Sequence, residues 1–198
     1  PVLLIPIYAI PLSSKAIPLD EVKIDIRLRD ALSAAFAHRS YVLLLSGFFV
    51  CGFHVSFITV HLPAYLADVE ISAASAAWAL SLIGLFNIVG SFIAGGLGQS
   101  YSKRQLLTLL YVLRGFVILA FVLSTKTNDT VFLFAAAMGL LWLSTVPLTS
   151  GLVAVMFGTR YLSTLFGFVF LSHQVGAFVG IWLGGFLFEV HGSYQPCL

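Results

Sequence analysis

The sequence predicts an all-α membrane protein, a polytopic bundle of transmembrane helices, on three observations. Of its 198 residues, 60% are hydrophobic and only 9% are charged, with a mean hydropathy of +1.03, whereas about a quarter of a soluble domain is charged. Long uncharged stretches recur at lengths that suit a bilayer. Backbone groups in lipid must be satisfied within the structure, which favours helices. The lipid bilayer is therefore an expected partner, and a net charge of +2 gives no argument for nucleic acid.

The first forty residues differ in composition from the rest of the chain. Residues 1–12 are apolar but short and contain three prolines, so we expect them to be the end of a preceding transmembrane helix. Residues 13–40 are polar and are expected to form a linker. The part from 28 to 38 has helix-forming residues and is expected to be an amphipathic helix at the membrane interface. Residues 41–198 then hold the transmembrane bundle.

Five stretches of the bundle are long enough to span a bilayer, which requires about 20 apolar residues per helix. The expected helices are 41–66, 75–98, 105–125, 131–157 and 161–188. Because only short connections join them, neighbouring helices are expected to be antiparallel. Pro63 and Pro147 lie inside two of the spans, and each is expected to bend or interrupt its helix.

The distribution of basic residues predicts the orientation, because positively charged loops stay in the cytoplasm. Lys126 lies on one side of the predicted bundle and Arg114 within a span. The other eight basic residues lie on the opposite side: Lys15, Lys23, Arg27, Arg29, Arg39, Lys103, Arg104 and Arg160. Segments 13–40, 99–104 and 158–160 are therefore expected to be cytoplasmic. The predicted location is the plasma membrane, here a bacterial inner membrane, with multiple spans.

Small residues recur at intervals of three or four along two of the spans, which predicts close helix contacts in lipid. The first stripe is Gly84, Asn87, Ser91, Gly95 and Gly98, and the second is Ser172, Gly176, Gly180 and Gly184. We interpret both stripes mainly as packing surfaces.

Polar residues from several spans fall at one depth when the spans are laid side by side at 1.5 Å per residue. These residues are His54, Asn87, Arg114, Trp142, Ser144, Thr145, His173 and Gln174. Polar groups inside a membrane usually face protein or a water-filled cavity, so the layer predicts a solute-binding and translocation site. Each histidine by itself is equally compatible with a hydrogen bond to a neighbouring helix. Arg114 needs a partner: a substrate anion, an acid from elsewhere in the protein, or helix carbonyls.

The sequence contains no pattern of a hydrolytic or metal-dependent enzyme. It has no HExxH motif, no pair of carboxylates within the spans and no glycine-rich phosphate loop with a lysine. Its two cysteines give neither a disulfide framework nor a metal-ligand spacing. We therefore predict no enzyme activity, no catalytic residues, no metal and no cofactor.

The segment GGLGQSYSKR at 95–104 resembles the second copy of the cytoplasmic loop of the major facilitator superfamily. The usual form is Gly-x-x-x-Asp-Arg/Lys-x-Gly-Arg-Arg/Lys. The resemblance implies a gating role for Gly95, Gly98, Gln99, Lys103 and Arg104. Gln99 stands where the family has an acid, so the charge contact made by that acid is not expected.

A further resemblance covers most of residues 41–194, including FFVCGFHVSFITVHLPAYL, WALSLIGLFNIVGS, MGLLWLSTVPLTSGLVA and RYLSTLFGFVFLSHQVGAFVGIWLGG. These strings are similar to bacterial monocarboxylate-transporter-like members of that superfamily, akin to oxalate–formate antiporters. The resemblance implies that the spans are helices 7 to 11 of a C-terminal half, that 1–12 is the tail of helix 6, and that helix 12 is missing.

The same resemblance implies alternating access with an N-terminal six-helix half that this sequence lacks, and coupling to a proton or a counter-anion. The sequence departs from the anion exchangers of the group, which carry basic residues in helices 8 and 11. Here helix 8 has Asn87, and helix 11 has His173 and Gln174.

The leading functional expectation is a secondary active transporter of a small organic solute, a monocarboxylate or another organic anion, of which this chain is a fragment. One alternative is a truncated membrane fragment without transport activity. Another is a transporter of non-carboxylate solutes, as in drug or metabolite efflux. An intramembrane enzyme fits the sequence less well because catalytic acids and metal ligands are missing from the spans. A channel fits less well because small-residue stripes and prolines within spans favour moving helices over a fixed pore.

Overall fold

The computed structural model describes residues 27–192, which form seven helices. They are α1 (Leu28–Ala37), α2 (Arg39–Asp68), α3 (Ala73–Ser100), α4 (Lys103–Leu123), α5 (Asn128–Trp142), α6 (Thr145–Phe157) and α7 (Leu162–His191). The predicted tail of a preceding helix at 1–12 and the first half of the linker, 13–26, lie outside the described residues, as do residues 193–198.

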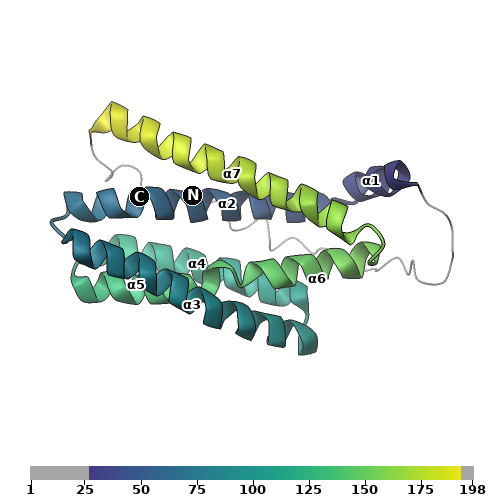
Figure 1. The fold of residues 1–198 in the computed structure, drawn as a ribbon, viewed down its shortest axis with the longest axis horizontal. Coiled ribbons are helices and arrows are strands. Elements are labelled where there is room, and N and C mark those ends of the chain that lie inside the picture. Colours follow the sequence, from purple (N-terminus) through teal and green to yellow (C-terminus); the bar gives the residue numbers. More distant parts are fainter. Residues whose placement is uncertain (1–26, 193–198) are drawn as a thin grey trace.

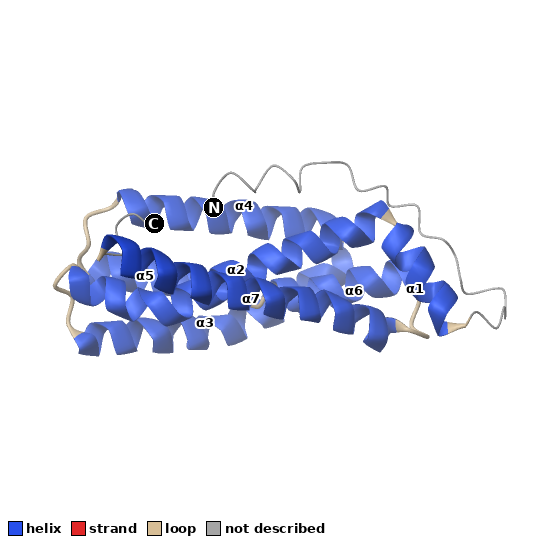
Figure 2. Ribbon diagram, turned by 90° about the horizontal axis from the view of Figure 1, so that it is seen from above, coloured by secondary structure: helices blue, strands red, loops and turns tan. Residues whose placement is uncertain are grey.

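Five helical segments of the described chain are long and apolar enough to cross a membrane, with α5 and α6 together forming one of them. They run side by side along the long axis of the molecule (Figures 1 and 2). Between residues 27 and 192 the structure contains no strand. The predicted all-α bundle of membrane-spanning helices is confirmed.

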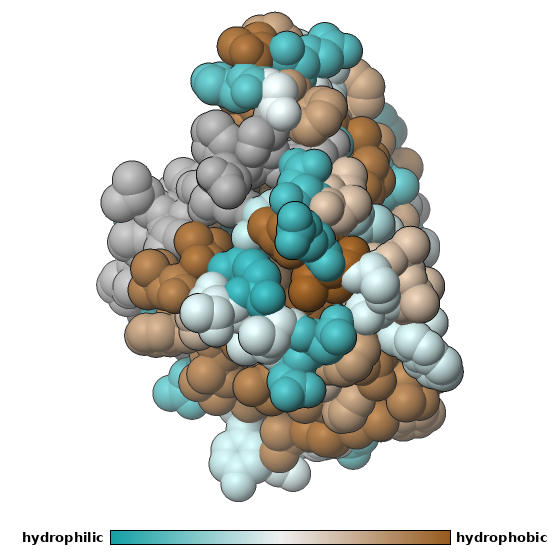
Figure 3. Space-filling model, turned by 90° about the vertical axis from the view of Figure 1, so that its left-hand side faces the viewer, coloured by the Kyte–Doolittle hydropathy of each residue, from teal (hydrophilic) through white to brown (hydrophobic). Residues whose placement is uncertain are grey.

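The two ends of the bundle differ in charge, as the sequence predicts. Helix α1 and the α6–α7 turn lie at one end, and the α2–α3 connection lies at the other (Figure 1). The described basic residues outside the spans cluster at the α1 end, whereas Lys126 follows α4 at the opposite end. Hydrophilic residues gather in the middle of that opposite end, with apolar residues around them (Figure 3).

The connection between α4 and α5 shows how a short loop satisfies the helix ends beside it. The Lys126 ammonium donates to the carbonyls of Phe121, Val122 and Ser124 at distances of 2.8, 3.1 and 2.6 Å. A cation in this position also favours the negative end of the helix dipole. Partial burial lowers the pKa of Lys126. Thr127 and Thr130 cap the start of α5 by reciprocal hydrogen bonds.

The two prolines within spans behave differently. The single helix expected over 131–157 is interrupted at Leu143 and Ser144, which separate α5 from α6. Pro147 has no N–H for the carbonyl of Leu143 four residues earlier, and its ring crowds that carbonyl. Instead, the N–H of Val146 donates to it at 3.0 Å. The expected interruption is thus found at Pro147, whereas α2 continues without interruption through Pro63.

The most extensive helix contact joins α2 and α7, and glycines allow it. A methyl group added to Gly176 would meet the backbone of Phe49, and one added to Gly180 would lie 2.5 Å from the carbonyl oxygen of Phe53. Three side chains link the same pair by bonds to backbone carbonyls. Tyr41 donates to Leu165 at 2.8 Å, Ser172 to Leu45 at 3.0 Å, and His61 to Ile181 at 3.1 Å. The predicted small-residue stripe on α7 is confirmed as a packing surface.

The stripe predicted on α3 was only partly correct. Gly84 and Gly95 face open space, with nothing within 4 Å of an added methyl group. The face that packs against α5 and α6 carries Gly98 of the predicted stripe together with Gly90, which was not part of it; an added methyl group would meet the side chain of Leu148 or the backbone of Leu140, respectively. Spacing alone shows that a small-residue face exists, but its direction depends on where the neighbouring helix lies.

We expect Gly176→Ala to lower the free energy of unfolding by about 1–3 kcal/mol, because the new methyl group overlaps backbone that cannot move independently. Gly185→Ala on the same helix is the matched control, because the space around Gly185 is open. It should leave stability unchanged or raise it by about 0.4–1 kcal/mol. Thermal unfolding in detergent measures both. Equal effects of the two substitutions would contradict the close α2–α7 contact.

Candidate functional site

Arg114 lies at the interruption between α5 and α6, near the middle of α4. Its side chain is 2% exposed. The Nη2 atom donates to the backbone carbonyls of Leu141 and Trp142 at 2.7 and 2.8 Å. These carbonyls lie at the C-terminal end of α5, where a helix leaves acceptors without intrahelical donors and carries the negative end of its dipole. Of the partners proposed for Arg114 from the sequence, the structure therefore places helix carbonyls in contact with it.

A second group of contacts joins Arg114 to α2. Its Nη1 atom donates to the sulfur of Cys51 at 3.1 Å, and that sulfur lies 3.8 Å from the hydroxyl of Thr145. The guanidinium carbon is 5.3 Å from the centre of the Tyr111 ring, a cation–π distance. Tyr111 in turn donates to the carbonyl of Gly47 at 3.1 Å. Cys51 was not among the residues predicted from the sequence, although it precedes His54 by about one helical turn.

Asn87 of α3 provides a hydrogen-bond acceptor for a backbone N–H within the interruption. Its side-chain oxygen accepts from the N–H of Leu143 at 2.9 Å. Ser144 donates to the carbonyl of Leu140 at 2.5 Å, and Thr145 donates to that of Trp142 at 3.3 Å. Asn87, Arg114, Trp142 and Thr145, all predicted at one depth, therefore meet at this junction. Trp142 takes part through its backbone, since its indole packs in the apolar cluster with Phe134 and Met138.

The predicted residues of α7 lie closer to the surface. His173 is half-buried and hydrogen-bonds to the exposed Gln174 at 3.2 Å. Its ring stacks on Phe170, with 5.7 Å between ring centres and an interplanar angle of 4°, and lies 5.2 Å from the ring of Phe48. These aromatic contacts limit the orientations of the imidazole.

Two buried polar atoms beside this region lack a hydrogen-bond partner in the described structure: Nδ1 of His54 and the hydroxyl oxygen of Thr149. Buried polar atoms are usually paired, so each is available for a hydrogen bond to a further group.

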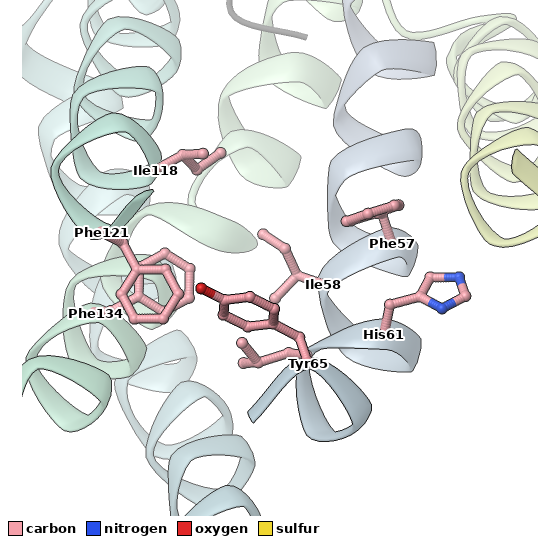
Figure 4. A pocket seen from close by; sticks show the side chains of 8 residues that line it. Phe57, Ile58, His61, Tyr65, Ile118, Phe121 and Phe134 are labelled. Atoms are coloured by element: carbon pink, nitrogen blue, oxygen red, sulfur yellow. The ribbon is translucent and has the colours of Figure 1, made fainter. Parts of the chain in front are cut away.

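The cavity shown in Figure 4 lies between α2, α4 and α5 and has a volume of about 30 Å³. It is lined by Phe57, Ile58, His61, Leu62, Tyr65, Ile118, Phe121 and Phe134. The imidazole of His61 points away from the two phenyl rings of α4 and α5 (Figure 4), and its Nε2 atom bonds to Ile181 of α7. The volume corresponds to about one water molecule, so this cavity does not accommodate an organic solute.

The predicted gating segment is mostly helical. Helix α3 continues to Ser100 and α4 begins at Lys103, so the turn expected over 99–104 contains only Tyr101 and Ser102. Gly98 lies against Leu148 of α6, and the stem of Lys103 lies against Gly151 of the same helix. Gly95 and Gln99 face outward, and Arg104 accepts a hydrogen bond from Thr108 through its carbonyl. The described residues contain no group of three side chains able to hold a metal ion.

We expect Asn87→Leu to destabilise the protein by about 1–3 kcal/mol, because the N–H of Leu143 then loses its acceptor. Ser81→Ala is the control, because the Ser81 hydroxyl bonds only to the carbonyl of Ala77 on its own helix. Thermal unfolding in detergent should show a decrease for Asn87→Leu alone. Equal stability of the two variants would exclude a structural role for the Asn87–Leu143 bond.

Comparison with known proteins identifies the family to which the chain belongs. The model of the Major Facilitator Superfamily matches residues 44–197. The chain is 28% identical over 157 residues to the uncharacterized MFS-type transporter YcxA of Bacillus subtilis (strain 168), covering 77% of the chain and 38% of that protein. It is 30% identical over 137 residues to monocarboxylate transporter 13 of Rattus norvegicus, covering 68% and 32%.

A third relative is monocarboxylate transporter 12-B of Danio rerio, 27% identical over 159 residues, covering 78% of the chain and 32% of that protein. No solved structure matches. The chain spans about a third of the length of these relatives. The helical bundle and the family match together lead to one conclusion: the chain belongs to the major facilitator superfamily and is similar to its monocarboxylate-transporter-like members.

Proposed function

We propose that this chain forms part of a secondary active transporter that moves a monocarboxylate or another small organic anion by alternating access. The charge distribution is the main support. Within the five predicted spans Arg114 is the one residue with a formal charge, and no Asp or Glu lies between 71 and 128 or between 130 and 188. The five spans therefore carry one formal positive charge and no negative charge. In a low-dielectric interior such a charge attracts an anion more strongly than it would in water.

His173 and Gln174 are the proposed solute contacts on α7. Both are polar, neither is fully buried, and the imidazole is held between Phe48 and Phe170. A side chain restrained in this way loses little conformational entropy when it binds a ligand. His54 and Thr149 each add a buried polar atom without a partner. These four side chains offer hydrogen bonds to a carboxylate, while Arg114 acts on it through its charge.

The names of two relatives support a carboxylate as the solute, since both are monocarboxylate transporters. The rest of the pathway is proposed to come from an N-terminal six-helix half. The driving force is proposed to be a coupled proton or counter-anion.

We expect cells that express the complete protein to take up one labelled acid from an organic-acid panel with saturation, and more strongly with a proton gradient if a proton is coupled. His173→Ala should reduce this uptake by about tenfold or more, as expected when a hydrogen bond to a charged group is lost. His191→Ala is the matched control, because His191 lies at the exposed end of the same helix.

Membrane levels of both variants must equal those of the wild type. If a well-expressed protein takes up no carboxylate, the proposal of an organic anion is wrong. Amphiphilic and cationic solutes would then be tested, as for an efflux transporter. Equal uptake by His173→Ala and the wild type would exclude His173 as a solute contact.

The proposed orientation places residues 158–160 in the cytoplasm. In a complete protein in which Cys197 and every cysteine outside this chain are replaced by serine, Asp129→Cys should react with a membrane-impermeant maleimide in intact cells. Arg160→Cys should react only after permeabilisation. The single buried Cys51 should not contribute in either case. The reverse pattern would show that the bundle has the opposite orientation.

A further inference from the structure

We propose that Arg114 is a positioning residue: its guanidinium binds the last carbonyls of α5 and thereby sets the direction of α6. In this proposal Arg114 does not touch the transported solute. The proposal concerns the interrupted helix itself. It is independent of which solute the protein carries, because it rests on contacts that Arg114 makes within the described bundle.

The geometry of the interruption supports this role for Arg114. Arg114 uses one nitrogen for two consecutive carbonyls, those of Leu141 and Trp142, at 2.7 and 2.8 Å. Close by, Val146 donates to Leu143 across three residues instead of four, and Pro147 has no N–H to donate. A helix end inside a membrane cannot use water for its carbonyls, and each unsatisfied group costs several kcal/mol. The guanidinium provides the hydrogen bonds that the interrupted helix cannot.

The guanidinium of Arg114 is also shielded from the surface of the bundle. The Arg114 side chain is 2% exposed, and Cys51 and Thr145, which lie beside it, are 2% and 0% exposed. A solute that binds to the surface of this bundle therefore does not reach the guanidinium. In other transporters with broken helices, the C-terminal ends of half-helices bind a coupling cation. Here the guanidinium of Arg114 already occupies the corresponding position at the end of α5.

Side chains from two neighbouring helices hold the junction between α5 and α6 from both sides. Arg114 of α4 donates to carbonyls before the interruption, and Asn87 of α3 accepts from the N–H of Leu143 within it. The sulfur of Cys51 connects the same guanidinium to α2. Helices α2, α3 and α4 thus fix the point from which α6 starts. Helix α6 carries Thr149 and packs against Gly98 of α3 and Lys103 of α4. A substitution at Arg114 is therefore expected to change the direction of α6 and, with it, the position of Thr149.

The test compares Arg114→Ala and Arg114→Lys with Arg160→Ala in the complete protein. Arg160→Ala is the matched control, since it removes an arginine charge from an exposed turn. The first measurement is thermal unfolding in detergent, with and without ethylguanidinium, and with tetramethylammonium as the cation control. We expect Arg114→Ala to lower the melting temperature and ethylguanidinium to restore part of it. Tetramethylammonium, which has no N–H group, should have no effect.

Arg114→Lys keeps the charge but lacks the planar fork of donors, so it should melt below the wild type and remain insensitive to ethylguanidinium. This variant also decides the outcome if Arg114→Ala does not fold. A melting temperature of Arg114→Lys equal to that of the wild type would overturn the proposal, because position and charge alone would then suffice.

The second measurement is uptake of the solute identified with the organic-acid panel. For a positioning residue, the maximal rate of Arg114→Lys should fall by about threefold or more with KM nearly unchanged. A raised KM at an unchanged melting temperature would show that Arg114 contacts the solute and would overturn the proposal. If no solute is found, the proposed transport function fails, but ethylguanidinium rescue still decides the role of Arg114.

Discussion

The rest of this bundle depends on how the interrupted helix satisfies its backbone in surroundings without water. Pro147 removes one donor, and the carbonyls at the end of α5 then need others. The guanidinium of Arg114 supplies them to Leu141 and Trp142, while Asn87 supplies the acceptor for Leu143. Because these two side chains come from α4 and α3, the interruption also fixes how those helices sit against α5 and α6. A polar cluster in the membrane thereby acts as a structural connector.

A second constraint acts on the other side of the bundle, where α2 and α7 approach closely. Helix association in lipid gains little from the hydrophobic effect and depends on packing and hydrogen bonds. Gly176 and Gly180 let the two backbones meet, and Tyr41 and Ser172 add bonds to backbone carbonyls along the contact. The pair therefore provides a firm support for His173. The ring contacts of His173 with Phe48 and Phe170 support its proposed role as a contact for an anionic solute.

The two constraints assign different roles to polar residues that share one depth. The side chains that hydrogen-bond to the backbone of the interrupted helix, Asn87 and Arg114, hold helices in place. His54, which has a buried atom without a partner, and the half-buried His173 have capacity for a ligand. In lipid both kinds of residue avoid the bilayer, which is why a sequence pattern places them together. The large cost of an unpaired polar group explains why the structural kind is found at the helix interruption.

The membrane class and the five spans follow from the sequence, because hydropathy and span length are local properties. Proline chemistry marked Pro63 and Pro147 alike, and the structure shows an interruption near Pro147, with α2 continuous through Pro63. The sequence also identified the mid-membrane polar layer. The contacts that the members of that layer make are seen only in the tertiary structure. Partners of Arg114 and Asn87 lie 27–28 and 56 positions away in the chain, and no local pattern encodes such contacts. The same reason explains why the α3 stripe was displaced towards Gly90, since the packing face of a helix is set by its neighbours.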